Sequence, residues 1–202
     1  MEKKVTQSER KHAAIIAAAI EEFRDKGFKA ASMDSLAARA QVSKRTVYNH
    51  FASKEILFQA IAQQLFDYSA QITRIRYQGE LPLAQQLMEF AGKELDLLAS
   101  ENFRDLAKIM IGECLHSPEL AASTMAQLSE QELSLEQWIG DAISDQKLKQ
   151  VEPAYAAGQF IALIKANAFW PQITMGQPIP DSTQRQQIAR DAVGMFLAYY
   201  AL

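Results

Sequence analysis

Cationic, hydroxyl, amide and aromatic side chains lie close together in one short segment of the chain, residues 44–50. Arg45 is able to donate two hydrogen bonds to a guanine in the major groove of DNA, and Lys44 and Thr46 flank it. If the segment forms a helix across the groove, its N-terminal side chains lie over base edges. Lys44, Arg45 and Thr46 are therefore the candidates for base contact, and Asn49 is a further candidate DNA contact on the same helix.

The residues around this segment have the pattern of a helix-turn-helix. Residues 32–57, SMDSLAARAQVSKRTVYNHFASKEIL, spell a helix, a turn, a second helix and the capped start of a third. The apolar members recur at spacings that place them on one side of two crossing helices: Leu36, Ala37, Ala40, Val42, Val47 and Phe51. The pattern predicts that the polar side chains of the second helix remain free to contact DNA.

Residues 10–57 resemble the DNA-binding domain of the TetR/AcrR family of bacterial transcriptional regulators. The resemblance rests on LAARAQVSKRTVYNHFASKEIL, which follows the family pattern of Leu/Ile-Ala, Ala-x-Val-Ser, Val-Tyr-x-His-Phe and Ser-Lys-Glu-x-Leu. It implies that Tyr48, His50 and Lys54 bind phosphate, along with the hydroxyl and backbone N–H groups at Ser32 and Ser43. The rest of the chain matches only the architecture of the family.

Two positions depart from the family pattern, and two interpretations stay open. Gln41 stands where the family usually has Gly in a turn that often needs a positive φ, so we expect local strain or a slightly different turn. Ser32 stands where many members have Thr, which retains the hydroxyl cap. Taken alone, Lys44 and Arg45 would favour a solvated helix face, and only the whole motif favours DNA contact. His50 is also compatible with a structural histidine.

The composition favours an all-α protein. The chain has 202 residues, 49% of them hydrophobic, and only eight Gly and six Pro, with little alternation of β-branched residues. The resemblance implies an N-terminal three-helix helix-turn-helix domain, residues 1–53. A long helix would join it to a helical effector-binding and dimerisation domain, residues 54–202. We expect about nine helices in all.

Caps and breakers predict the helix bounds. Thr6 and Glu9 have capping-box spacing, and Gly27 follows the last turn of a first helix over about residues 8–26. No breaker interrupts residues 54–76, which predicts one long connecting helix. The expected later segments are about 82–99, 102–115 with Asn102 as cap, 117–145, 153–170 and 182–201.

Charge and motif size together indicate the partners. Residues 1–60 hold eleven Lys/Arg against seven Asp/Glu, a net of +4, whereas residues 61–202 hold ten against seventeen, a net of −7. Polyanion binding should therefore be confined to the N-terminal part. Because one helix-turn-helix offers few base contacts, we expect a homodimer on a pseudo-palindromic site in double-stranded DNA.

The last two expected helices have residues suited to such a dimer. Small side chains there allow close approach, and aromatic ones supply contact area: Ala156, Ala157, Gly158, Gly194 and Ala198 beside Phe160, Phe196 and Tyr200. The alternative is that the same residues pack inside one subunit. Dimerisation through this pair of helices is the favoured expectation.

The resemblance also implies a small-molecule effector among the C-terminal helices. Met and aromatic side chains can line an adaptable apolar cavity, although such residues at helical spacing are ordinarily core. The candidate pocket residues are Phe66, Phe90, Met110, Cys114, Trp138, Phe160, Asn167 and Trp170. A ligand there would move the 54–76 helix and change the separation of the two recognition helices.

The sequence shows no pattern for catalysis, for a cofactor or for a metal. It has no Ser/His/Asp or Cys/His arrangement and no Gly-rich phosphate loop, and Glu113 and His116 alone do not make a metal site. Cys114 is the single cysteine, so a redox role has no support.

No apolar run reaches the length of a membrane span, and the N-terminus lacks a signal peptide, so we expect a soluble cytoplasmic protein. The expected function is a sequence-specific transcriptional regulator, with repression favoured by family habit. The alternative is a helical DNA-binding adaptor or architectural protein without a ligand switch.

Overall fold

The computed structural model describes residues 6–128 and 134–202, and the regular elements in these ranges are eleven α-helices. Outside the helices, the described residues contain one isolated bridge, between Leu148 and Ala201. The expectation of an all-α protein is confirmed. The helices gather into two compact units, one of residues 1–66 and 105–129 and the other of residues 67–104 and 130–202.

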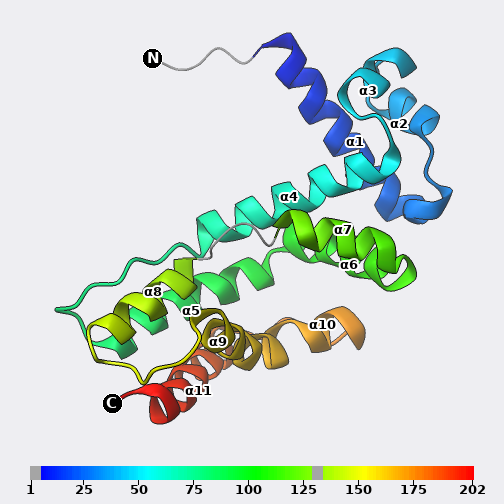
Figure 1. Ribbon diagram of the computed structural model, residues 1–202. Coiled ribbons are helices and arrows are strands. Elements are labelled where there is room, and N and C mark those ends of the chain that lie inside the picture. The colour runs from blue at the N-terminus through cyan, green and yellow to red at the C-terminus, as the bar shows by residue number, and fades with distance from the viewer. Residues whose placement is uncertain (1–5, 129–133) are drawn as a thin grey trace. The chain divides into compact units, whose positions relative to one another are not determined.

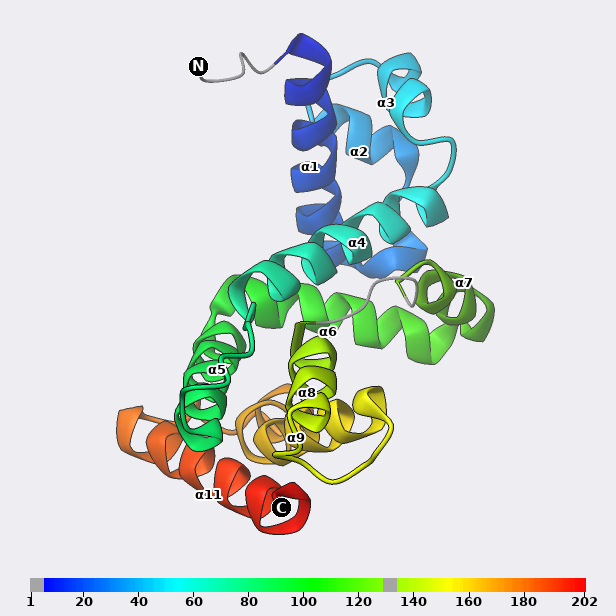
Figure 2. The same ribbon diagram turned by 60° about the vertical axis from the view of Figure 1, so that its left-hand side comes forward.

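Unit 1 holds the predicted helix-turn-helix. Its helices are α1 (Gln7–Ala30), α2 (Met33–Arg39), α3 (Lys44–His50), the first part of α4 (Lys54–Ile72), most of α6 (Glu101–His116) and α7 (Pro118–Leu128). In Figure 1 and Figure 2, α2 and α3 lie next to each other beside α1. The expected domain boundary after residue 53 stays a prediction.

The local signals at the start of the chain have the expected effect. Thr6 and Glu9 form the capping box, with the Thr6 N–H donating to Glu9 Oε2 at 2.7 Å. Gly27 breaks the regular helix with φ of 76° and ψ of 160°, and a last helical turn follows it. Ser32 and Ser43 cap α2 and α3, and Ser53 Oγ accepts from the Ile56 N–H at 3.3 Å.

Unit 2 is built from α5 (Leu83–Ala99), α8 (Ser134–Ser144), α9 (Pro153–Ala168), α10 (Trp170–Thr174) and α11 (Ser182–Tyr200), with the end of α4 and the start of α6. The last helix, α11, packs against α5 and α9, and α8 packs against α9. Figure 1 and Figure 2 both show α9 and α11 side by side.

Two expected bounds were wrong because tertiary contacts and neighbouring caps override the local pattern. α4 ends at Ile72 and not at residue 76, and Ile75 is buried in the following loop, where its N–H donates to Ser134 Oγ at 3.2 Å. The hydroxyl at the start of α6 belongs to Ser100, whose Oγ accepts from the Phe103 N–H, so Asn102 is not the cap.

The count of eleven helices differs from the expected nine in two places. The expected segment over 117–145 contains both α7 and α8, and residues 129–133 between them lie outside the described residues. Phe169, with φ of −138° and ψ of −61°, separates α9 from α10, in which Pro171 occupies the first turn. An apolar pattern that continues through Phe169 therefore belongs to two helices.

A buried glutamine holds the loop before α5. Gln86 is 3% exposed, and its Oε1 accepts from the indole N–H of Trp138 and the backbone N–H of Gln78, both at 2.9 Å. Its Nε2 donates to the carbonyls of Gln78 and Leu81, also at 2.9 Å. The amide is thus fully bonded, and α5, α8 and the loop are linked through it.

The turn between α2 and α3 has the strain expected of a Gln in place of Gly. Gln41 has φ of 54°, a conformation in which a Cβ costs about 1–2 kcal/mol. Gln41→Gly should therefore raise the free energy of unfolding by about 1 kcal/mol in urea denaturation. Gln64→Gly, at an exposed position in the interior of α4, should lower it by about 1 kcal/mol. If Gln41→Gly left the protein no more stable than the wild type, the strain would be contradicted.

Candidate nucleic-acid interface

The second helix of the helix-turn-helix, α3, is held in place by two side chains. Val47 is fully buried and Phe51 is 3% exposed, and both belong to the core that joins α1, α2 and α4. At the other end, Ser43 Oγ accepts from the Thr46 N–H at 3.1 Å and lies 2.8 Å from Thr46 Oγ1. Packing and capping thus stabilise a helix of seven residues that is too short to form alone.

The outer face of α3 carries groups that the rest of the described chain does not use. Arg45 and Asn49 are exposed, Tyr48 is 51% exposed, and none of the three side chains forms a hydrogen bond or ion pair with another described residue. Lys44 pairs with Asp34 at 2.5 Å, but both side chains are more than half exposed, so the pair contributes little. The face can exchange water for an external ligand without losing a strong internal contact.

The expected phosphate contacts from Ser32, Ser43 and His50 stay predictions. The Ser32 hydroxyl accepts from the Ser35 N–H at 3.1 Å, so the serine hydroxyls at both helix starts act as caps. The His50 ring lies 5.7 Å from the ring of His12, which in turn lies 4.8 Å from Phe51. These contacts give His50 a packing role whether or not it touches DNA.

Lys54, also expected at phosphate, has a structural contact that sequence reasoning missed. Its ammonium group donates to the carbonyls of Phe28 at 2.6 Å, Lys29 at 3.2 Å and Ala31 at 3.0 Å, and lies 4.5 Å from the centre of the Phe28 ring. Because all three donors are occupied, Lys54 fastens the start of α4 to the end of α1. A phosphate contact would require these bonds to break.

A charged cluster orients α2 on α1. Arg39 contacts Glu21 at 3.3 Å, Glu22 at 3.0 Å and Asp25 at 2.9 Å, and Glu22, only 1% exposed, also bonds Lys26 at 2.7 Å. The hydrogen bond from Lys26 is the largest of several causes that lower the pKa of Glu22. The i, i+4 spacing of Glu22 and Lys26 is visible in the sequence, whereas the partners of Arg39 on α1 are not.

The eight candidate pocket residues do not form one cluster within either unit. Phe66, Met110 and Cys114 belong to unit 1 and the other five to unit 2. Burial is the main cause that raises the pKa of the Cys114 thiol, which gives no support to a reactive thiolate.

In unit 2 most of the candidates have core or surface positions. Trp138 is buried against Gln86, and the rings of Phe90 and Phe160 lie 6.0 Å apart in the core. Trp170 is 46% exposed, and only Asn167 lines the large groove of this unit. The membership of the effector pocket stays a prediction.

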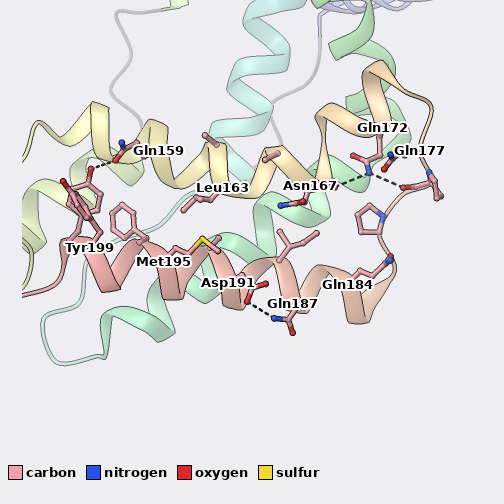
Figure 3. A pocket seen from close by; sticks show the side chains of 18 residues that line it. Gln159, Leu163, Asn167, Gln172, Gln177, Gln184, Gln187, Asp191, Met195 and Tyr199 are labelled. Carbon is pink, nitrogen blue, oxygen red and sulfur yellow. Dashed lines mark hydrogen bonds between the residues drawn. The ribbon is translucent and has the colours of Figure 1, made fainter.

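That groove runs between α9 and α11 and has a volume of about 920 Å³. Figure 3 shows Leu163 and Asn167 on one wall and Met195 and Tyr199 on the other. Met195 is 59% exposed and Tyr199 is 68% exposed, although both are large apolar side chains. We call this surface the α9–α11 groove.

Two family models together match most of the chain. The model described as bacterial regulatory proteins, tetR family, matches residues 15–61, and the model for the C-terminal domain of AefR-like transcriptional repressors matches residues 85–202. The chain belongs to the TetR family. It is therefore a DNA-binding transcriptional regulator, as the helix-turn-helix predicted.

Individual TetR relatives agree with this assignment. A solved TetR-family regulator from Pseudomonas syringae pv. tomato DC3000 is 39% identical, with a TM-score of 0.82, over 98% of this chain and 99% of that one. The solved flavonoid-responsive regulator FrrA is 27% identical, with a TM-score of 0.76, over 95% and 97%. The transcriptional regulator UidR of Escherichia coli K12 is 27% identical over 151 residues, 74% of this chain and 72% of its own length.

The described helices were compared with what a membrane span or a metal site requires. Within residues 6–128 and 134–202, no helix is both long and apolar enough to cross a membrane. The same residues contain no group of three His, Cys, Asp or Glu side chains placed to hold a metal ion. The relatives compared above are described as transcriptional regulators.

The contact of Lys54 with α1 predicts a loss of stability. Lys54→Met retains the aliphatic stem but removes three charged hydrogen bonds, so the free energy of unfolding in urea should fall by about 1.5–3 kcal/mol. Lys11→Met, which removes a lysine without a described hydrogen bond or ion pair of its side chain, should change it by less than about 0.5 kcal/mol. Unchanged stability in the Lys54 variant would restore phosphate binding as its main role.

Proposed function

We propose that this TetR-family protein is a cytoplasmic homodimeric repressor that reads a pseudo-palindromic operator through α3 and leaves it when a small molecule binds. The observation that carries the proposal is the outer face of α3, where Arg45, Tyr48 and Asn49 are exposed and free of described partners on a helix that is firmly anchored. Such a face is suited to groups in the major groove.

Arg45 is the strongest candidate for base reading. Its guanidinium has no described partner to give up, and a bidentate contact with guanine provides about 1–3 kcal/mol of discrimination. Lys44 has only the exposed contact with Asp34 to exchange, whereas Thr46 Oγ1 is bonded to Ser43. Arg45 and Lys44 therefore fit base edges better than Thr46 does.

Contacts with the DNA backbone would come from residues at the edges of the same surface. Tyr48 and Asn49 have exposed donors on α3, and His50 with the exposed residues Ser32 and Ser43 would add hydrogen bonds to phosphate. Lys54 is not carried forward as a DNA contact, because its donors bond backbone carbonyls.

The α9–α11 groove supports dimerisation through the last long helices. It exposes large apolar side chains, including Met195 and Tyr199, along a surface of unit 2. Burying such side chains against a second copy is favourable, at about 25 cal/mol per Å² of apolar area. A second subunit would supply the second recognition helix that the operator requires.

Ligand release and repression rest on the relatives. The C-terminal family model is that of AefR-like repressors, and the relative FrrA is described as flavonoid-responsive. In this chain α4 starts in unit 1 directly after α3 and continues into unit 2. A ligand that prefers one arrangement of α4 would change the DNA affinity by at most the ratio of its affinities for the two arrangements.

The function is tested by selecting genomic fragments with the purified protein and then screening metabolites for release of the bound fragment. The proposal expects a salt-sensitive complex that needs two half-sites, and at least one small molecule that lowers its affinity. Equal binding to all fragments would contradict operator recognition. Binding to specific fragments that no metabolite releases would contradict the ligand switch alone.

Arg45→Ala should relax the sequence preference. Because a bidentate contact with guanine would be lost, discrimination against a changed base in the operator should fall roughly tenfold to a hundredfold in competition gel shifts. Arg76→Ala, at an exposed position in the loop after α4, removes the same charge and should leave discrimination unchanged. If the Arg45 variant kept full discrimination and lost only overall affinity, Arg45 would be a phosphate contact.

Met195→Glu should separate the subunits. A carboxylate in the α9–α11 groove would be desolvated in a dimer, so the variant should sediment as a monomer, and operator affinity should fall about a hundredfold as avidity is lost. Leu115→Glu changes a residue that is 77% exposed on α6 and should remain dimeric. A dimeric Met195 variant would place the subunit interface elsewhere.

A further inference from the structure

A second hollow lies within unit 1, between the end of α1 and α6. It has a volume of about 350 Å³, within the range of about 300–1,000 Å³ that small-molecule sites occupy. Phe23, Phe28 and Ile109 provide apolar surface, and Gly27, where α1 breaks, also lines it. We call it the α1–α6 groove. None of the candidate DNA contacts or candidate pocket residues lines it.

A buried acid in the α1–α6 groove has no partner in the described chain. Glu113 is 8% exposed and lines the groove, yet its carboxylate forms no hydrogen bond or ion pair with another described residue. A carboxylate with no internal cation beside it can accept a cationic group of a ligand without giving up another contact. Glu22, the other buried acid of unit 1, has Arg39 and Lys26 beside it, which shows how this unit satisfies a buried carboxylate when it can.

Cations without partners lie on the same groove. Lys29 and Lys108 are exposed, line the hollow, and have no described side-chain hydrogen bond or ion pair, whereas Lys26 is bonded to Glu22 at 2.7 Å. The Nδ1 atom of His116 bonds the Gly112 carbonyl at 2.7 Å, which leaves Nε2 as its second polar atom. The groove therefore combines an acceptor for a cation, donors for an anion and an apolar wall.

We propose that the α1–α6 groove binds an L-amino acid with an apolar side chain. The α-ammonium group would bond the Glu113 carboxylate, the α-carboxylate would bond Lys29 and Lys108, and the side chain would lie on Phe28 and Ile109. A plain organic acid would satisfy the lysines but leave Glu113 unpaired. A zwitterion with an apolar body satisfies all three features at once.

Isothermal titration of the full-length protein with three molecules of one shape tests the site: L-leucine, its 2-hydroxy acid and 4-methylpentanoate. All three carry the same branched chain and carboxylate, and they differ in the group that would face Glu113. Leucine should bind at least about tenfold more tightly than the hydroxy acid, and 4-methylpentanoate should bind most weakly. Equal affinities would overturn the role of Glu113, and no heat from leucine, methionine or phenylalanine at millimolar concentration would overturn the site.

Two variants locate the binding. Lys108→Met changes an exposed residue without a described partner, so it should fold and weaken leucine binding at least about tenfold. Glu113→Gln should reduce the difference in affinity between leucine and 4-methylpentanoate. Lys93→Met, on α5 with Glu89 as partner at 2.7 Å, is the control outside the groove and should bind like the wild type. Leucine binding that survives both groove variants would overturn the proposal, whether or not the protein reads an operator.

Discussion

The anchoring of α3 by two buried side chains is the constraint on which the DNA-reading surface depends. An isolated helix of seven residues is unstable in water, because nucleation fixes several backbone torsions for each hydrogen bond gained. Val47 and Phe51 tie α3 to the core, and this burial fixes which side of the helix faces out. Arg45, Tyr48 and Asn49 are exposed as a consequence, since they occupy the remaining positions of the same two turns.

Polar contacts inside unit 1 hold the helices that support α3. These contacts also occupy several basic side chains, so they reduce the positive charge that unit 1 can offer to DNA. The N-terminal excess of positive charge suggested polyanion binding, but Lys26, Arg39 and Lys54 all bond groups within the unit. Arg45 does not. The number of basic residues in a segment therefore overstates the charge available to DNA, and the partners of each residue decide how much is left.

Features set by neighbouring residues could be predicted from the sequence, and features set by distant ones could not. The capping box at Thr6 and the break at Gly27 follow from local backbone chemistry. The positive φ of Gln41 was expected only because the resembled family has Gly at that turn. The loop after α4 is bonded to Ser134, about sixty residues later, and Lys54 bonds carbonyls more than twenty residues earlier. Aromatic residues that fill a core and aromatic residues that line a cavity have the same spacing in a helical sequence. The candidate pocket residues are therefore divided between the two units.

We expect two copies of α3 to read bases in the major groove of one operator. Methylation interference at guanine N7 on a selected fragment tests it most directly, because N7 lies on the major-groove edge that a bidentate arginine contacts. Interfering guanines should fall in two symmetric half-sites on one face of the duplex. Interference in a single half-site, or binding that no N7 methylation affects, would contradict it.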